Sequence, residues 1–195
     1  MRAKRFDVCN TTAVRFDYSE PGAYFVTIVM QGRECLFGEI VNGEMKLNDA
    51  GMMIVKWWRE LPNKFPSVKL GAFTAMPNHF HGIIQVVEIV GADLRVCPDD
   101  ESEKGGHIGP PQQVSPLQRP DAPLSQMIQW FKTMTTNEYV RGVKELDWKS
   151  FVGKLWQRNY YERVIRNEKK WDRIHRYIES NPSHWAEDDE NLLNT

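Results

Sequence analysis

The pattern of apolar and polar positions alternates between strand-like and helix-like stretches along the chain. Residues 23–30 (AYFVTIVM) are nearly continuously apolar, which predicts a strand at the centre of a sheet. Residues 68–76 and 79–89 are two further β-prone runs joined by a tight Pro-Asn connection, and residues 159–165 predict a short fourth strand. Residues 35–46, with an Asn-Gly pair at 42–43, predict a small separate hairpin.

Three other stretches have the periodicity of amphipathic helices. Asn48 can cap a helix that runs to residue 61, where Pro62 ends it. A second helix is predicted from residue 124 to about residue 140, and a third over residues 168–181, stopped by the proline that follows. The apolar stripes of the first two helices are Ile54, Trp57, Trp58 and Leu61, and Leu124, Met127, Ile128 and Phe131.

The order of these elements is β-α-β-β-α-β followed by an extra helix. This order predicts an α+β fold on the ferredoxin-like split βαβ plan, an antiparallel sheet with both crossover helices on one face. The other face is then free for chemistry or for the C-terminal helix. The length of 195 residues predicts one domain over residues 1–195. Residues 91–123 contain six prolines and a Gly-Gly pair, and we expect them to form a mobile insertion in that domain.

The strand that begins at residue 79 opens with His79-Phe80-His81. Side chains alternate faces along a strand, so the two histidines share a face and Phe80 points to the other. Two imidazoles on a rigid strand form half of a site for a divalent metal. An isolated pair of this kind more often marks polar positions on the solvent face of a strand. A metal site therefore requires further ligand residues elsewhere in the chain. Gly82 follows, and a glycine in a strand allows another backbone segment or a ligand to approach closely.

The last predicted helix supplies candidate partners for this pair. Arg173, Tyr177 and Asn181 fall at i, i+4 and i+8 on one polar face, beside an apolar stripe of Trp171, Ile174 and Ile178. A tyrosine and an asparagine one turn apart are uninformative alone. Together with the two histidines they suggest a site in which the amide oxygen of Asn181 is a third metal ligand and Tyr177 is a nucleophile beside the metal.

The charge of the chain is unevenly distributed. The formal net charge is −1, but residues 141–176 contain eleven Lys or Arg against five Asp or Glu. Acidic residues at 99–103 and 187–190 offset this excess in the total. A locally basic segment fits contact with backbone phosphates, and Arg158, Arg173 and Lys132 are candidate DNA contacts. For Lys132, a solvated position on a helix is the competing interpretation.

Cysteines and long apolar runs are sparse. Three cysteines lie far apart without a CxxC pair, which argues against a disulfide framework and against a cysteine zinc site. No apolar run has the length of a membrane span and no signal-peptide pattern is present, so we expect a cytoplasmic protein with no membrane partner.

Three segments together resemble a known family. MPNHFHGII, LSQMIQWFKTMTT and WQRNYYERVIRNEKKWDRIHRYIESNP are similar to single-tyrosine HUH transposases, above all to REP-associated tyrosine transposases and their insertion-sequence relatives. The resemblance covers residues 24–185. It implies that His79, His81 and Asn181 bind Mg²⁺ or Mn²⁺ and that Tyr177 is the catalytic tyrosine. It also implies nicking and strand transfer of single-stranded, hairpin-containing DNA through a covalent 5′-phosphotyrosine, by a monomer or a homodimer.

Other functions remain open at this point. A replication-initiator-type HUH nickase would share the chemistry, and a catalytically silent nucleic-acid-binding protein would share the fold. The same split βαβ plan also occurs in RNA-binding modules, which stack bases on aromatic residues of the exposed sheet face. Here the exposed positions of the His strand are expected to be His79, His81, Ile83 and Gln85, with Phe80 turned inward, which disfavours that module.

Overall fold

The computed structural model describes residues 21–87, 122–188 and 190–191. These residues form a four-stranded antiparallel sheet in the order β4-β5-β1-β6. The strands are β1 (Gly22–Val29), β4 (Val68–Ala75), β5 (His79–Val86) and β6 (Tyr161–Ile165). The first strand is central, as predicted, and the order is that of the split βαβ plan. The insertion predicted at residues 91–123 lies outside the described residues except for its last two, so it stays a prediction.

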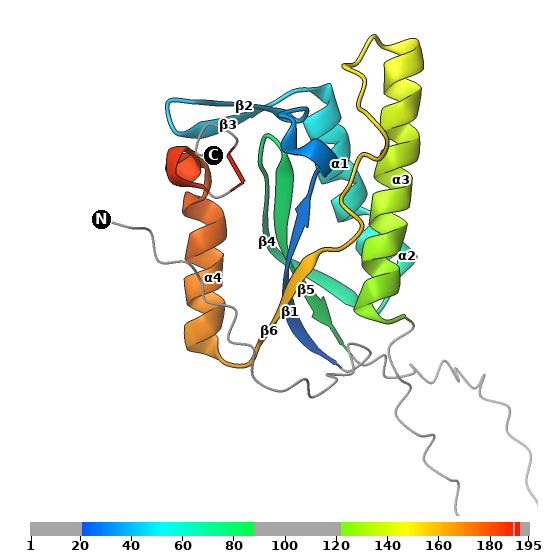
Figure 1. The fold of residues 1–195 in the computed structure, drawn as a ribbon. Coiled ribbons are helices and arrows are strands. Elements are labelled where there is room, and N and C mark those ends of the chain that lie inside the picture. Colours follow the sequence, from blue (N-terminus) through cyan, green and yellow to red (C-terminus); the bar gives the residue numbers. More distant parts are fainter. Residues whose placement is uncertain (1–20, 88–121, 189, 192–195) are drawn as a thin grey trace, which may run out of the picture.

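Helices lie on both faces of this sheet (Figure 1). The helices α1 (Asp49–Arg59), α2 (Leu61–Lys64) and α3 (Leu124–Glu145) lie on one side, and α4 (Glu168–Ser180) lies on the other. The predicted α+β class, with the crossover helices on one face and an additional C-terminal helix, is confirmed. The α4 face is therefore the one on which side chains of the two central strands can meet the C-terminal helix.

Alternate side chains along the strands belong to two separate hydrophobic cores, one on each face of the sheet. Phe80 and Ile84 of β5 belong to the large core beneath α1 and α3, whereas Ile83 packs with Ile174 and Ile178 of α4. His79 and His81 have the parity of Ile83 and therefore lie on the face that α4 covers. The two histidines share a face, as predicted, but the expected exposure of His79, His81 and Ile83 is wrong, because α4 packs on this face and all three residues are buried. The large core also includes Tyr24, Val26, Ile28, Ile54, Trp58, Leu61, Leu124, Met127, Ile128 and Phe131.

Gly82 allows a close approach, but of a core side chain and not of the backbone or ligand that the sequence predicted. A Cβ atom there would lie 2.4 Å from Cζ2 of Trp58, whose side chain is fully buried. The indole of α1 thus lies directly against the backbone of β5 on the core face. This contact fixes the strand that carries the two histidines.

The separate hairpin consists of β2 (Gly38–Val41) and β3 (Glu44–Leu47). Asn42 and Gly43 adopt φ of 54° and 78°, the two positive values that a type I′ turn requires. Two 3-10 segments complete the description, η1 (Gln31–Arg33) and η2 (Pro182–Glu187). The hairpin is as predicted.

Two helix boundaries differ from the sequence-based expectation. The predicted stop at Pro62 is wrong, because α1 already ends at Arg59 and the proline lies in the first turn of α2. Proline is tolerated there because the N–H that another residue would have at this position would find no acceptor within the helix. The helix α3 continues to Glu145, and Gly142 near its end lets Trp148 pack against the backbone, where a Cβ atom would lie 2.3 Å from Cε3 of that indole.

Candidate active site

The two histidines of β5 face each other on the α4 side of the sheet. Their Nε2 atoms are 3.0 Å apart, and the residues are 0% and 4% exposed. Burial lowers the pKa of His79 well below 6.5, with the neighbouring His81 and Arg33 acting in the same direction. Burial also lowers the pKa of His81 to about 3. Both rings are therefore neutral near pH 7, the form in which an imidazole nitrogen binds a metal.

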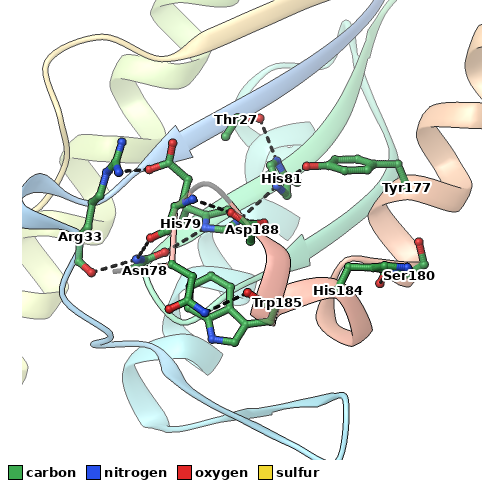
Figure 2. Close-up of polar contacts among 12 residues, drawn as sticks. Thr27, Arg33, Asn78, His79, His81, Tyr177, Ser180, His184, Trp185 and Asp188 are labelled. Atoms are coloured by element: carbon green, nitrogen blue, oxygen red, sulfur yellow. Dashed lines mark hydrogen bonds and ion pairs between the residues drawn. The ribbon is translucent and has the colours of Figure 1, made fainter. Parts of the chain in front are cut away.

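Neighbouring side chains orient both rings (Figure 2). The Nδ2 atom of Asn78 donates to the carbonyls of Arg33 and Glu190 at 2.9 and 2.7 Å, which fixes the orientation of the amide. Its Oδ1 atom therefore accepts from Nδ1 of His79 at 2.9 Å, and the Nε2 lone pair of that ring points into the site. Nδ1 of His81 lies 2.8 Å from Oγ1 of Thr27 on β1. Each ring thus has one nitrogen engaged and one turned toward its partner.

The helix α4 brings Tyr177 to this pair. Its hydroxyl lies 3.5 Å from Nε2 of His81, and its ring packs edge-on against Phe25 at a centroid distance of 6.0 Å. Figure 2 shows the hydroxyl pointing at the histidine. Ile174 and Ile178 of the same helix are buried against the sheet, so the helix position is fixed by packing. The side chain of Tyr177 remains 39% exposed and accessible from solvent.

Two side chains with oxygen atoms, one at the end of α4 and one after η2, are further candidates. Asn181 is the C-terminal cap of the helix and is 3% exposed, and its buried Oδ1 atom has no hydrogen-bond partner among the described residues. Asp188 was not singled out in the sequence. Its Oδ2 atom lies 3.9 Å from Nε2 of His79, and one ligand atom from each of His79, His81 and Asp188 lies within 4.8 Å of the others.

This set of side chains fits a divalent cation. Two nitrogen atoms 3.0 Å apart subtend about 90° at an ion bound by each at ~2.1 Å, which is the angle between neighbouring ligands of an octahedron. The amide oxygen of Asn181 is buried and unpartnered among the described residues, and its role as a ligand stays a prediction. Imidazole nitrogens together with carboxylate and amide oxygens suit Mn²⁺ or a similar transition ion better than Mg²⁺.

The chain after α4 folds back over the histidines. The ring of Trp185 lies 5.9 Å from that of His79, and Nε of Arg33 forms an ion pair with Glu190 at 2.9 Å. The side chain of Asn191 donates to the carbonyl of Trp185 at 3.0 Å. We refer to residues 185–188 with 190–191 as the closing segment. It packs against His79 through Trp185 and carries Asp188.

Comparisons with known proteins identify the family. A family model described as "Transposase IS200 like" matches residues 117–181, which include α3, β6 and α4 with Tyr177. An uncharacterised protein of Haemophilus influenzae is 36% identical over 177 residues, which cover 89% of this chain and 87% of the relative. The chain belongs to the IS200-like transposase family. The predicted resemblance to single-tyrosine transposases is thereby confirmed.

A solved structure shares the fold of this transposase. A REP-associated tyrosine transposase bound to a REP hairpin superposes with a TM-score of 0.53 at 17% identity, over 88% of this chain and 73% of that chain. Family membership makes the protein a DNA-processing enzyme of the transposase type. Within the described residues, no helix combines the length and the apolar character needed to cross a bilayer.

The structure corrects one candidate DNA contact of the transposase. Lys132 is only 8% exposed, and its ammonium donates to the carbonyls of Gln157, Arg158 and Asn159 at 3.0, 3.4 and 3.0 Å. Burial lowers its pKa to about 8. The expected surface position is wrong, because helical periodicity places this residue toward the segment that precedes β6. Because the carbonyls engage the protons of its ammonium, Lys132 is no longer a candidate DNA contact.

The other candidates lie where a ligand can reach them. Arg158 and Arg173 are exposed, and their contact with DNA stays a prediction. Among the other tyrosines of the transposase, Tyr24 and Tyr139 are buried in the core, Tyr160 is half-buried and Tyr161 is 62% exposed. Of the two adjacent tyrosines, Tyr160 packs against the large core just before β6, whereas Tyr161, the first residue of β6, is exposed.

Proposed function

We propose that this transposase nicks single-stranded DNA beside a hairpin through Tyr177 and transfers the cleaved strand to another 3′-hydroxyl. The observation that carries the proposal is the position of the Tyr177 hydroxyl, 3.5 Å from Nε2 of His81 and thus next to a pair of neutral imidazoles. A nucleophile placed by a packed helix beside a candidate metal site is the arrangement that phosphoryl transfer requires.

His79 and His81 would hold a divalent cation, with Asn181 and Asp188 as oxygen ligands. When bound, such an ion supplies positive charge that offsets the charge of the scissile phosphate and orients it for in-line attack. The contribution of this chain is to keep both Nε2 lone pairs directed at one point. Asn78 and Thr27 do this through Nδ1 of the two rings.

The reaction at Tyr177 is a transesterification. Its phenolic oxygen forms a bond to phosphorus, and the bond between phosphorus and the 3′ oxygen of the preceding nucleotide breaks. The phenolic proton is balanced by the proton that the leaving 3′ oxygen gains. The product is a 5′-phosphotyrosine whose ester energy is conserved, so that attack by another 3′-hydroxyl rejoins the strand. An unperturbed phenol has a pKa of about 10, so a nearby cation would promote its ionisation.

Single-stranded DNA with a hairpin is the substrate that we infer. The tyrosine must reach a position in line with one P–O bond, which the stacked geometry of a duplex obstructs. The structural neighbour bound to a REP hairpin supports a hairpin substrate for this protein as well. Arg173 on α4 and Arg158 before β6 are the proposed phosphate contacts.

The closing segment has to shift during this reaction. His79 is fully buried and His81 is 4% exposed. A phosphate therefore cannot reach the two imidazoles while the closing segment stays in the position described. The contacts that hold the segment include the ion pair between Arg33 and Glu190, whose side chains are 34% and 17% exposed.

The test is incubation of the protein with hairpin DNA carrying single-stranded flanks, in Mn²⁺ or Mg²⁺, followed by a denaturing gel. We expect a covalent protein–DNA adduct that disappears with EDTA and in the His79→Ala and His81→Ala variants, because each loses a ligand of an open site. The perfectly paired duplex of the same sequence should form much less adduct.

Three results would contradict parts of this proposal. Full activity in EDTA would remove the metal. Tight DNA binding without any adduct would favour a catalytically silent nucleic-acid-binding protein. Nicking without rejoining would remove the strand transfer.

A further inference from the structure

The active-site face of the sheet continues from His81 to the edge strand β6. In the strand register His81 is paired with Thr27, and Thr27 is paired with Tyr161. Antiparallel pairing keeps paired residues on one face, so Tyr161 stands on the same face as the histidines, about 10 Å away across two strand spacings. Its side chain is 62% exposed, which is unusual for an aromatic residue next to a catalytic site.

An open hollow of about 500 Å³ lies beside this tyrosine. Its lining consists of Gln31, Gln157, Arg158, Asn159, Tyr160 and Tyr161. Three side-chain amides offer both donors and acceptors, as the edges of nucleobases do, and one guanidinium adds positive charge. None of these six lining residues is acidic. The volume falls within the range of small-ligand pockets.

The backbone that presents these side chains is tied down from below. The ammonium of Lys132 binds the three successive carbonyls of residues 157–159. The N–H of Gln157 donates to the carbonyl of Val29 at 2.9 Å, and the N–H of Gln31 donates to the carbonyl of Leu155 at 2.8 Å. A buried lysine thus organises a segment whose residues line the hollow, and the side-chain amide of one of them, Gln157, also donates to the carbonyl of Met30 at 3.4 Å. A site held in advance in this way loses little entropy on binding.

We propose that this hollow binds a nucleobase of the single-stranded DNA next to the scissile phosphate. Tyr161 stacks on the base, the amides of Gln31, Gln157 and Asn159 bind its edge, and Arg158 binds a neighbouring phosphate. Three features favour this occupant: the face is continuous with Tyr177 and His81, the aromatic ring is exposed, and none of the lining side chains is acidic. This inference rests on the proposed function, because the proposed reaction requires a single strand of DNA, which would cross β6.

The test measures DNA binding without cleavage, in a Tyr177→Phe background, by fluorescence anisotropy. The two probes are a labelled DNA hairpin with a single-stranded extension of normal nucleotides and the same hairpin with an abasic extension. We expect Tyr161→Ala to weaken binding to the first probe about 5- to 100-fold, the range for loss of one stacked base, and to leave binding to the abasic probe unchanged. Tyr161→Phe keeps the ring and should bind both probes as the parent does.

Arg158→Gln should weaken binding to both probes equally and lower the salt slope by about one unit. Lys64→Gln removes an exposed cation of α2, on the other side of the sheet, and is the matched charge control. Circular dichroism of each variant checks that the fold is retained.

The proposal would be overturned if Tyr161→Ala weakened binding to both probes equally or to neither. It would also be overturned if the parent protein bound neither probe. The adduct assay separates this result from the proposed function. An adduct at Tyr177 without a base-dependent effect of Tyr161→Ala removes the base site alone. A base-dependent effect without any adduct leaves the base site and removes the proposed reaction.

Discussion

Each histidine of the site uses one ring nitrogen for a neighbouring side chain and turns the other toward its partner. For His81 that neighbour is Thr27, whose hydroxyl lies 2.8 Å from Nδ1 across the β1–β5 pair. For His79 it is Asn78, whose own amide orientation is fixed by two carbonyls. Partners of this kind set the tautomer and the angle of a metal-binding ring, and their loss weakens binding.

Thr27→Val tests this arrangement with a nearly isosteric change. We expect the affinity for Mn²⁺, measured by electron paramagnetic resonance or calorimetry, to fall about 10- to 100-fold, because His81 loses the group that orients it. Thermal stability should change little, since one hydrogen bond contributes about 1 kcal/mol. Unchanged Mn²⁺ affinity would show that the sheet alone orients the ring.

Sequence reasoning reached His79, His81 and Tyr177 because strand and helix periodicity each specify a face. It missed Asp188, because this residue reaches the site through a return of the chain after α4 that no local pattern records. It also placed Lys132 on the surface, because helical spacing does not reveal which side of α3 meets the segment before β6. Asn181 fits as a buried, unpartnered amide, and its role as a ligand stays a prediction.

At the scale of elements, the position of β5 depends on a close contact with α1. The Trp58 indole fills the space that any side chain at Gly82 would need. The glycine therefore sets the distance between helix and strand, and the strand in turn carries both histidines.

Gly82→Ala should destabilise the protein by about 1–3 kcal/mol in urea unfolding, because the new methyl group forces the indole or the strand to shift. Gly22→Ala is the matched control in β1, since a Cβ atom there would lie 3.5 Å or more from other heavy atoms. Equal stability of the two variants would mean that the core absorbs the methyl group without cost.

A second element-scale contact joins α3 to the segment before β6 through Lys132. We expect Lys132→Met to lower the free energy of unfolding by about 1–3 kcal/mol, because three carbonyls lose their donor. Lys64→Met, at an exposed position, should have little effect in the same urea titration. A more stable Lys132→Met variant would show that burying the ammonium destabilises the protein by more than its three hydrogen bonds stabilise it.

At the scale of the whole molecule, the fold follows from the order of apolar runs and the loops between them. The sequence left the second face of the sheet open for chemistry or for the C-terminal helix, and the structure places α4 there. The central position of β1 and the Asn-Gly hairpin were predictable, because each rests on a local pattern of residues. The helix boundaries at Pro62 and near Glu145 were not, because packing of neighbouring chain segments decides them. The basic 141–176 segment spans the end of α3, β6 and most of α4, on which the proposed DNA path runs.

The central claim is that Tyr177 becomes covalently joined to the 5′ end of cleaved DNA. The most direct measurement is mass spectrometry of the protein trapped with hairpin DNA and Mn²⁺, compared with Tyr177→Phe and with Tyr139→Phe, which removes the same atom from a tyrosine of the core. We predict a nucleotide on the peptide that contains Tyr177, no adduct in Tyr177→Phe and an undiminished adduct in Tyr139→Phe. A nucleotide on any other tyrosine, or an adduct that survives in Tyr177→Phe, would contradict the account.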